Sequence, residues 1–186
     1  ASLLREWQLH RETSNGMAGL WMTHYVDALH MMLDLGYPVS AVAMGGNYVW
    51  KDGRENADTF HAVIEYSEGL LFDWGMSLGT GADWRFNICG RNGAIECQGG
   101  SLSSTKWLLS GKGAEDPKKI KERLIETEPT SNHMVNFLEC IRTREKPRAD
   151  IQYGHQHAVA SILAATAETT GRRHRYDAAK REIVAL

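Results

Sequence analysis

Two residues in the first part of the sequence carry side chains that together could transfer a proton. His24 and Asp27 lie three positions apart within residues 16–36, which read GMAGLWMTHYVDALHMMLDLG. Residues three apart are neighbours on a helix surface, and an imidazole beside a carboxylate can act as a general acid or base near neutral pH. The same residues could instead form a buried hydrogen bond that only satisfies both polar groups. A concave polar opening around His24 favours proton transfer, and full burial favours the structural pair.

The residues around this pair predict one helix over 16–36. Apolar residues recur there at helical spacing, so we expect them to form a stripe that faces the core. Residues 13–15 are candidate N-caps, and Gly36 followed by Pro38 ends the helix. The predicted stripe comprises Leu20, Trp21, Ala28, Met31, Met32 and Leu35.

Other motifs that would carry chemistry are missing from the sequence. The glycines at 45–46 and 79–81 lead into predicted strands, and no GxGxxG or Walker A motif occurs, so no nucleotide cradle is predicted in this chain. His155 and His157 lie two positions apart on a predicted helix, where they point in different directions and make a poor chelate. HExxH, GxSxG and CxxC are absent as well. The sequence therefore predicts neither a metal site nor a nucleophile.

Composition excludes several classes of protein. Hydrophobic residues make up 42% of the 186 residues and charged residues 24%, which is enough apolar material for a core. The net charge of −2 argues against nucleic acid or an anionic membrane as a partner. No apolar run approaches the roughly 18 residues of a membrane-spanning helix. The three cysteines form no disulfide framework, so we expect a reducing, cytoplasmic compartment.

Strand patterns dominate residues 39–110. Apolar and polar residues alternate over 59–66 and again over 70–78, which is the period of half-buried strands. Short turns connect the segments, and Asn92-Gly93 is typical of a type I′ hairpin turn. Strands joined by short turns are antiparallel. We therefore predict an open antiparallel sheet of about six strands, mostly a meander.

The last third of the sequence adds two predicted helices. One of residues 130–131 caps a helix that ends at Lys146-Pro147, and Asp150 caps a second helix over 151–170. No internal repeat or linker is visible. We predict a single α+β domain over 1–186, with helices packed on one face of the sheet.

The other face of the predicted sheet has no helix to cover it. Val63, Leu71 and further apolar residues lie on that face among polar ones. This is more apolar surface than a solvated face needs. We therefore expect a homodimer or tetramer that forms through the open sheet face.

Three groups of motifs follow one another in an order that is similar to a known family. They are the glycine-rich stretch 16–27 with its HxxD, residues 48–60 with 65–69, and residues 136–142, 146–150, 154–155 and 170–172. Their order and spacing resemble the C-terminal domain of the Gfo/Idh/MocA oxidoreductases, the glucose–fructose oxidoreductase and inositol dehydrogenase group. The resemblance covers nearly the whole chain.

The resemblance implies the substrate-side and oligomerisation domain of an NAD(P)-dependent oxidoreductase that acts on a sugar, cyclitol or related polyol. In that family a preceding Rossmann domain binds NAD or NADP and supplies a lysine that joins an Asp-xxx-His pair. His24 matches the catalytic histidine, whereas Leu20 stands at the position of the aspartate. Either Asp27 orients His24 instead, or the histidine works without a carboxylate, or the activity differs. Asp27 and Trp21 would line the substrate pocket, with Trp84 and the loop 79–83 as further candidates.

The resemblance also implies that this chain is a fragment. It opens ASLLREWQLH, without an initiating Met or a signal peptide. We expect the Rossmann domain to lie upstream, the fragment alone to be inactive, and no cofactor to bind to it. The alternative is a non-catalytic oligomerisation or binding module in which His24 and Asp27 are only structural.

Overall fold

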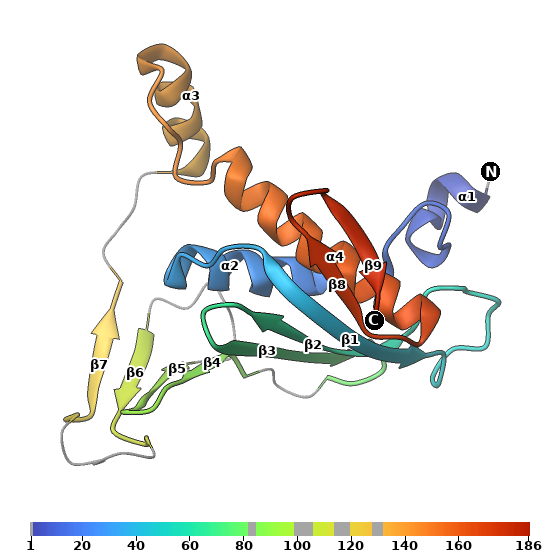
Figure 1. Ribbon diagram of the computed structural model, residues 1–186, viewed down its shortest axis with the longest axis horizontal. Helices are drawn as coiled ribbons and strands as arrows, with labels where there is room; N and C mark the ends of the chain where they lie inside the picture. Colours follow the sequence, from blue (N-terminus) through green and yellow to red (C-terminus); the bar gives the residue numbers. More distant parts are fainter. Residues whose placement is uncertain (1, 82–84, 99–105, 114–119, 128–131) are drawn as a thin grey trace. The chain divides into compact units, whose positions relative to one another are not determined.

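The computed structural model describes residues 2–81, 85–98, 106–113, 120–127 and 132–186 (Figure 1). These residues belong to two compact units. The first unit comprises Ala1–Thr80 and Arg148–Leu186, and the second comprises Gly81–Pro147. Each unit contains one antiparallel sheet. The α+β class is thereby confirmed, and the single domain over 1–186 stays a prediction.

The sheet of the first unit has five strands in the order β3-β2-β1-β8-β9, and every neighbouring pair is antiparallel. The central hairpin follows the predicted alternation, because Phe60, Ala62, Ile64 and Tyr66 are buried and the residues between them are not. The strands are β1 (Pro38–Gly46), β2 (Thr59–Tyr66), β3 (Leu70–Ser77), β8 (His174–Asp177) and β9 (Glu182–Ala185).

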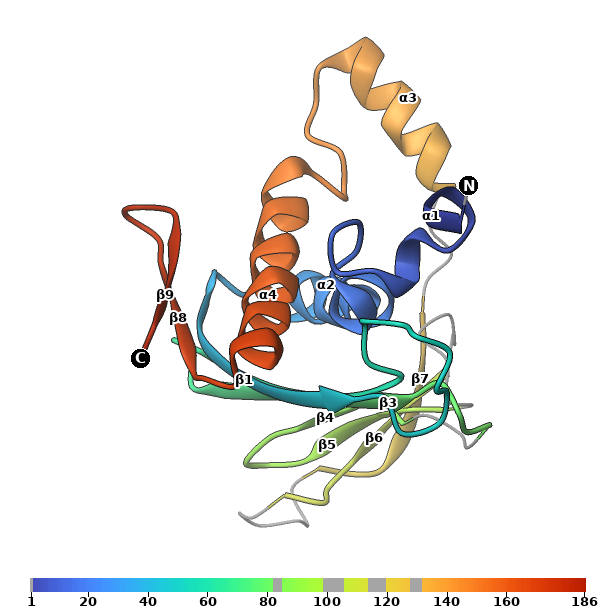
Figure 2. The ribbon, with the colours of Figure 1, turned by 90° about the vertical axis from the view of Figure 1, so that its right-hand side faces the viewer.

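Helices lie on one face of this sheet, as predicted (Figures 1 and 2). Helix α4 (Ile151–Thr170) packs on β1, and α2 (Thr23–Leu33) packs against α4. Asp150 caps α4 by accepting hydrogen bonds from two backbone N–H groups, and Gly171 ends it with a φ of 66°. Before α2 come α1 (Ser2–Arg5), the short 3-10 turn η1 (Trp7–Leu9) and the turn η2 (Ala18–Met22).

Small side chains let α4 approach the sheet closely. Ala160, Ala164 and Ala167 are fully buried on α4 together with Leu163. Tight packing of this kind contributes dispersion as well as hydrophobic stabilisation.

Within the described residues, no helix is long and apolar enough to span a bilayer.

The described residues of the second unit form a four-stranded sheet in the order β4-β5-β6-β7 and one helix. A hairpin forms at Asn92-Gly93 as predicted, since Cys89 pairs with Ala94 across it. The turn is not of the predicted type I′, because neither Asn92 nor Gly93 has a positive φ. The N-cap of the helix is Asn132, one position after the predicted residues 130–131. The elements are β4 (Asn87–Cys89), β5 (Ala94–Cys97), β6 (Lys106–Ser110), β7 (Arg123–Glu126) and α3 (His133–Thr143).

The strands do not form the single sheet of about six strands that was predicted. The described residues form nine strands in two sheets. Alternation within a segment identifies a strand but does not tell which distant strand will pair with it. The residues after α4 fold back as β8 and β9, and β8 pairs with β1 through Ser40 and Arg175.

Candidate functional site

The helix predicted over 16–36 begins with an irregular turn. Ala18–Met22 forms a π-helical turn that runs directly into α2. The N–H of Thr23 donates to the carbonyl groups of both Ala18 and Trp21. A π turn holds an additional residue, and such turns are frequent at functional sites. The residues before Met22 therefore do not continue the faces of α2.

The buried face of α2 is not the predicted stripe. Within the predicted stripe, Trp21, Met31 and Met32 are 45–46% exposed, whereas Leu35 is buried. The buried residues are instead Met22, Val26, Leu29 and His30. Apolar residues occur on several faces of this helix, so spacing alone could not select the face that α4 covers. The π turn adds to the error by rotating residues 18–21.

The structure does not form the predicted pair between His24 and Asp27. Asp27 contacts His157 on α4, with 3.0 Å between Oδ1 of Asp27 and Nδ1 of His157. His24 is exposed and makes no hydrogen bond or ion pair with any described residue. The buried hydrogen bond between His24 and Asp27 that the structural interpretation assumes therefore does not form, and the role of the two residues stays a prediction. His24 lies on an open helix surface next to a carboxylate that another residue holds.

Electrostatic interactions keep Asp27 in its charged form. The hydrogen bond from His157 lowers the pKa of Asp27, while burial acts in the opposite direction. Positive charge on His157, His30 and His24 lowers it further. Burial lowers the pKa of His30, which is 0% exposed and lies 2.8 Å from the hydroxyl of Tyr66. Of these three histidines, His24 is the most accessible to solvent.

Trp21 belongs to a different feature, a cavity of about 280 Å³. The cavity is lined by the N-terminal segment, the π turn and the loop between β1 and β2. Its apolar lining residues include Leu9, Met17, Leu20, Trp21, Ala57 and Leu78. His24 and Asp27 do not line it. The structure thus places Trp21 and the His24–Asp27 region on one helix without joining them in one cavity.

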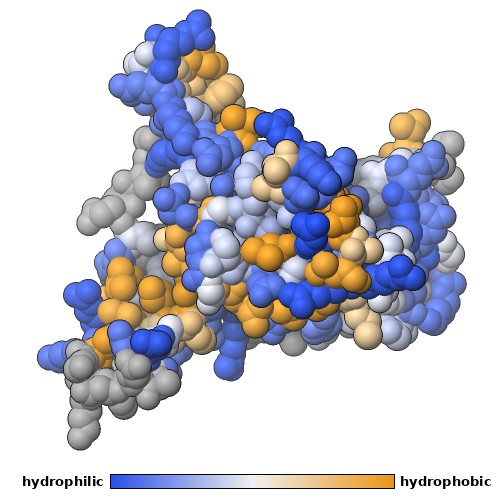
Figure 3. Space-filling model, in the orientation of Figure 1, coloured by the Kyte–Doolittle hydropathy of each residue, from blue (hydrophilic) through white to orange (hydrophobic). Residues whose placement is uncertain are grey.

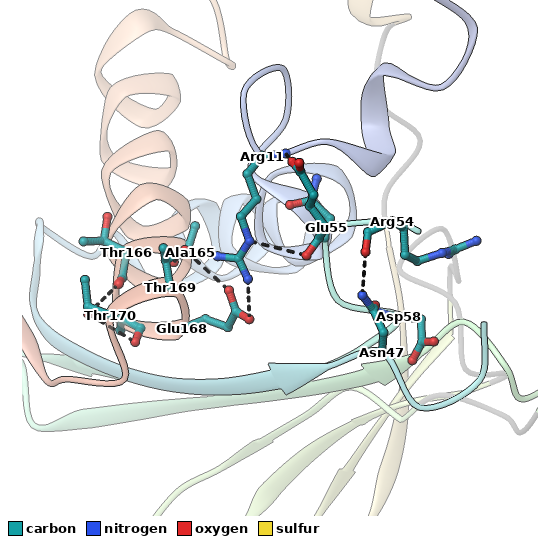
Figure 4. A network of polar contacts seen from close by, with 12 residues as sticks. Arg11, Asn47, Arg54, Glu55, Asp58, Ala165, Thr166, Glu168, Thr169 and Thr170 are labelled. Atoms are coloured by element: carbon teal, nitrogen blue, oxygen red, sulfur yellow. Dashed lines mark hydrogen bonds and ion pairs between the residues drawn. The ribbon is translucent and has the colours of Figure 1, made fainter. Parts of the chain in front are cut away.

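A buried carboxylate holds the loop between β1 and β2. Asp58 is 0% exposed and accepts hydrogen bonds from the backbone N–H groups of Tyr48, Val49 and Trp50 at 3.0, 2.8 and 2.9 Å. The side chain of Asn47 donates to the carbonyl of Arg54 and accepts from the N–H of Asp58 (Figure 4). This network fixes the part of the loop that forms the cavity wall.

A second network ties the N-terminal segment to the rest of the first unit (Figure 4). The guanidinium of Arg11 contacts Glu168 at 3.1 Å and Thr169 at 2.5 Å, both near the end of α4. The N–H of Arg11 donates to the carboxylate of Glu55 at 2.9 Å. Asn56 donates from its side chain to the carbonyl of Gln8 at 2.8 Å. The wall of the cavity is therefore fixed on two sides by polar contacts.

Comparison with known proteins identifies the family. The sequence model described as the GFO/IDH/MocA C-terminal domain matches residues 3–96. The chain belongs to this family. Comparison with curated proteins finds no match.

Several solved structures share the fold at low sequence identity. An NAD-binding protein from Listeria innocua is 16% identical, with a TM-score of 0.67 over 91% of this chain and 50% of that chain. Aldose–aldose oxidoreductase from Caulobacter crescentus is 17% identical, with a TM-score of 0.69 over 91% and 50%. The WlbA dehydrogenase from Bordetella pertussis, in complex with NADH and UDP-GlcNAcA, is 17% identical, with a TM-score of 0.61 over 92% and 48%. The chain spans about half the length of these structures.

In this chain Leu20 stands where the family resemblance places a catalytic aspartate. The resemblance assigns a catalytic aspartate to this position, and the structure places Leu20 in the apolar wall of the cavity. Trp84, predicted to contact substrate, lies outside the described residues. Sequence reasoning missed His157 and Asp58, because a contact between distant segments leaves no local pattern. The only sequence signal for either was the close spacing of His155 and His157.

The described residues do not contain a dinucleotide site of the Rossmann type. All of the strand pairs that the structure describes are antiparallel. A Rossmann cradle needs a parallel strand, a glycine-rich turn and a helix N-terminus in succession. Gly16 and Gly19 precede α2 but follow no strand. Within the described ranges, no group of three His, Cys, Asp or Glu side chains could hold a metal ion either.

Proposed function

We propose that this chain is the substrate-side domain of an NAD(P)-dependent oxidoreductase that acts on a sugar, cyclitol or related polyol. The observation that carries the proposal is the exposed imidazole of His24, one helical turn from the fixed carboxylate of Asp27. Membership in the GFO/IDH/MocA family supports it, as do the aldose–aldose oxidoreductase and the WlbA dehydrogenase that share the fold.

In this mechanism His24 handles the proton of the substrate hydroxyl. The imidazole accepts the proton when the alcohol is oxidised and returns it when the carbonyl is reduced. The negative charge of Asp27 stabilises the imidazolium that forms. The hydride would be exchanged with a nicotinamide, which another domain of the full-length protein would hold. Trp21, exposed one turn before His24, contacts the ring of the substrate.

The test is an activity screen with the full-length protein. A panel of sugars, cyclitols and polyols is offered with NAD⁺ and, separately, with NADP⁺, and nicotinamide absorbance is followed. We expect reduction of one nucleotide with at least one member of the panel. If neither nucleotide is reduced by any member, and the corresponding carbonyl compounds are not reduced by NADH or NADPH, the proposal is wrong.

We expect that the isolated 186-residue chain binds neither NAD nor NADP. The reason is the antiparallel topology of the described strands together with the absence of a GxGxxG motif in the sequence. Calorimetric titration with each nucleotide should give no heat beyond dilution, and the full-length protein is the positive control. Stoichiometric binding to the isolated chain would contradict this expectation.

We also propose that the chain self-associates through the open face of the five-stranded sheet. Met44 and Leu71 are 76% and 67% exposed there, and Val42 pairs with Val63 on the same face. Apolar and polar side chains are also mixed over β8 and β9 at the edge of this sheet (Figure 3). Apolar surface of this kind is typical of an interface.

Sedimentation at increasing concentration should therefore show a dimer or tetramer. Leu71→Glu should dissociate it, because a charge directed into an apolar interface loses its hydration. The matched control is Ile151→Glu, which changes an exposed apolar residue at the start of α4, away from the sheet face. A wild-type chain that stays monomeric at high concentration would contradict the proposal.

A further inference from the structure

The contact between His157 and Asp27 fixes the protonation of one ring nitrogen. An ionised carboxylate only accepts hydrogen bonds, so Nδ1 of His157 must carry the proton that it shares with Oδ1 of Asp27 at 3.0 Å. The two residues come from different helices, α4 and α2, which pack against each other. His157 therefore holds the carboxylate in one orientation from outside the helix that carries it.

This contact is not required for the packing of the two helices. The side chains of His157 and Asp27 are 27% and 37% exposed. Ion pairs with this exposure contribute about 0–1 kcal/mol to stability. The helix faces beside them are buried through Met22, Val26 and Leu163. The pair thus needs an explanation other than holding α2 to α4.

The second carboxylate oxygen of Asp27 has no hydrogen-bond partner among the described residues. His24 lies one turn towards the N-terminus of α2, and helical side chains lean in that direction. The ionisable side chains that act on Asp27 are His24, His30 and His157, all of which can carry positive charge. His30 is buried against Tyr66, so His24 is the partner with room to move towards Asp27.

We propose that His157 is a positioning residue for His24. Its Nδ1–H holds one oxygen of Asp27, so that the other oxygen orients the imidazole of His24 and stabilises it when protonated. The order His157, Asp27, His24 links α4 to the residue that transfers the proton. The role of His24 in this inference rests on the proposed function, whereas the hold of His157 on Asp27 does not.

Kinetics of the full-length enzyme test the positioning role. We expect His157→Leu to lower kcat by about ten- to hundredfold, the range typical when a partner that orients a functional group is removed, with little change in KM. His157→Asn should restore most of the activity, because its amide nitrogen can take the place of Nδ1. The control is His155→Leu, two positions away, whose ring contacts Tyr37 and which should leave kcat unchanged.

A double variant shows whether His157 acts through His24. In a His24→Asn background, adding His157→Leu should cause no further loss of kcat, since residues that act as one unit are not additive. If His157→Leu lowers kcat by the same factor in both backgrounds, His157 does not position His24 and the inference is overturned.

A measurement on the 186-residue chain separates this inference from the proposed function. Carboxyl-carbon NMR should show that His157→Leu raises the pKa of Asp27 towards its ordinary value, because it removes the hydrogen bond that lowers it. At a fixed neutral pH the ring resonances of His24 should shift in the same variant and not in His155→Leu. If the full-length protein lacks oxidoreductase activity, the proposed function fails while these shifts still support the contact. Unchanged resonances of both Asp27 and His24 overturn the inference.

Discussion

His24→Asn should lower kcat of the full-length enzyme by about a hundred- to ten-thousandfold, the contribution of a well-placed general acid–base group. Asparagine is polar and of similar size, but it cannot accept and return a proton near neutral pH. The exposed position of His24, with no hydrogen bond to any described residue, means that the substitution should leave the fold intact. Steady-state kinetics and urea unfolding of both proteins measure the two effects.

Asp27→Asn is the companion variant. If Asp27 orients His24, the neutral amide should also slow the reaction, by less than the loss of His24 itself. His155→Asn is the control for replacing an exposed histidine, because the His155 ring contacts Tyr37 and not His24 or Asp27. Equal kcat in wild type and His24→Asn, with both proteins folded, would remove His24 from the mechanism and favour a non-catalytic role for this domain.

Local signals in the sequence predict the elements that carry the site. Alternation identified β2 and β3, and the cap residue Asp150 marked the start of α4. His24 and Asp27 were found because both lie on one short helix. Signals of this kind depend on neighbouring residues, so they remain readable without a structure.

The contacts that complete the site are not local. Asp27 meets His157 across 130 positions of sequence, and β8 meets β1 across a similar span. The π turn at Ala18–Met22 has no clear pattern of its own, and it rotates Leu20 and Trp21 away from the positions that regular helical spacing predicts. These features follow from packing between distant segments, which one sequence does not specify by its periodicity.

Leu20 shows why the site cannot be transferred from the family position by position. A carboxylate at this position would face a largely apolar wall with Met17, Ala57 and Leu78, where a charge loses hydration. The guanidinium of Arg54 also lines this cavity, but it already pairs with Asp52. Asp27 loses less hydration because it is only half-buried, and the hydrogen bond from His157 outweighs that cost. We therefore expect the orienting carboxylate in this chain to be Asp27.

Replacing Asp58 should destabilise the loop between β1 and β2 more than any other part of the cavity wall. Each carboxylate oxygen of Asp58 accepts two hydrogen bonds: Oδ1 from Tyr48 N–H and Thr59 hydroxyl, Oδ2 from Val49 and Trp50 N–H. Asp58→Asn replaces one oxygen with an NH₂ group that would face donors. We expect it to lower the free energy of unfolding by about 2–3 kcal/mol, the cost of losing hydrogen bonds to a buried charged group.

The effect of Asp58→Asn should depend on pH in a definite direction. Burial raises the pKa of Asp58, but the N–H groups of Trp50, Tyr48 and Val49 and the hydroxyl of Thr59 together lower it below the ordinary value. A group whose pKa is lower in the folded state stabilises the protein above its unfolded pKa of about 4, and this contribution is lost as pH falls through the folded pKa. The stability difference between wild type and Asp58→Asn should therefore be constant at neutral pH and shrink below about pH 4.

Urea unfolding at a series of pH values measures this difference. Asp52→Asn is the matched control, since Asp52 lies in the same loop, is exposed and pairs with Arg54 at the surface; it should change stability far less than Asp58→Asn. Residues 54, 56 and 57 line the same cavity as Trp21, which is proposed to contact the substrate, so the Asp58 variant should also raise KM of the full-length enzyme. A difference from wild type that is small at neutral pH, or that grows as the pH falls, would show that the carboxylate of Asp58 does not hold the loop.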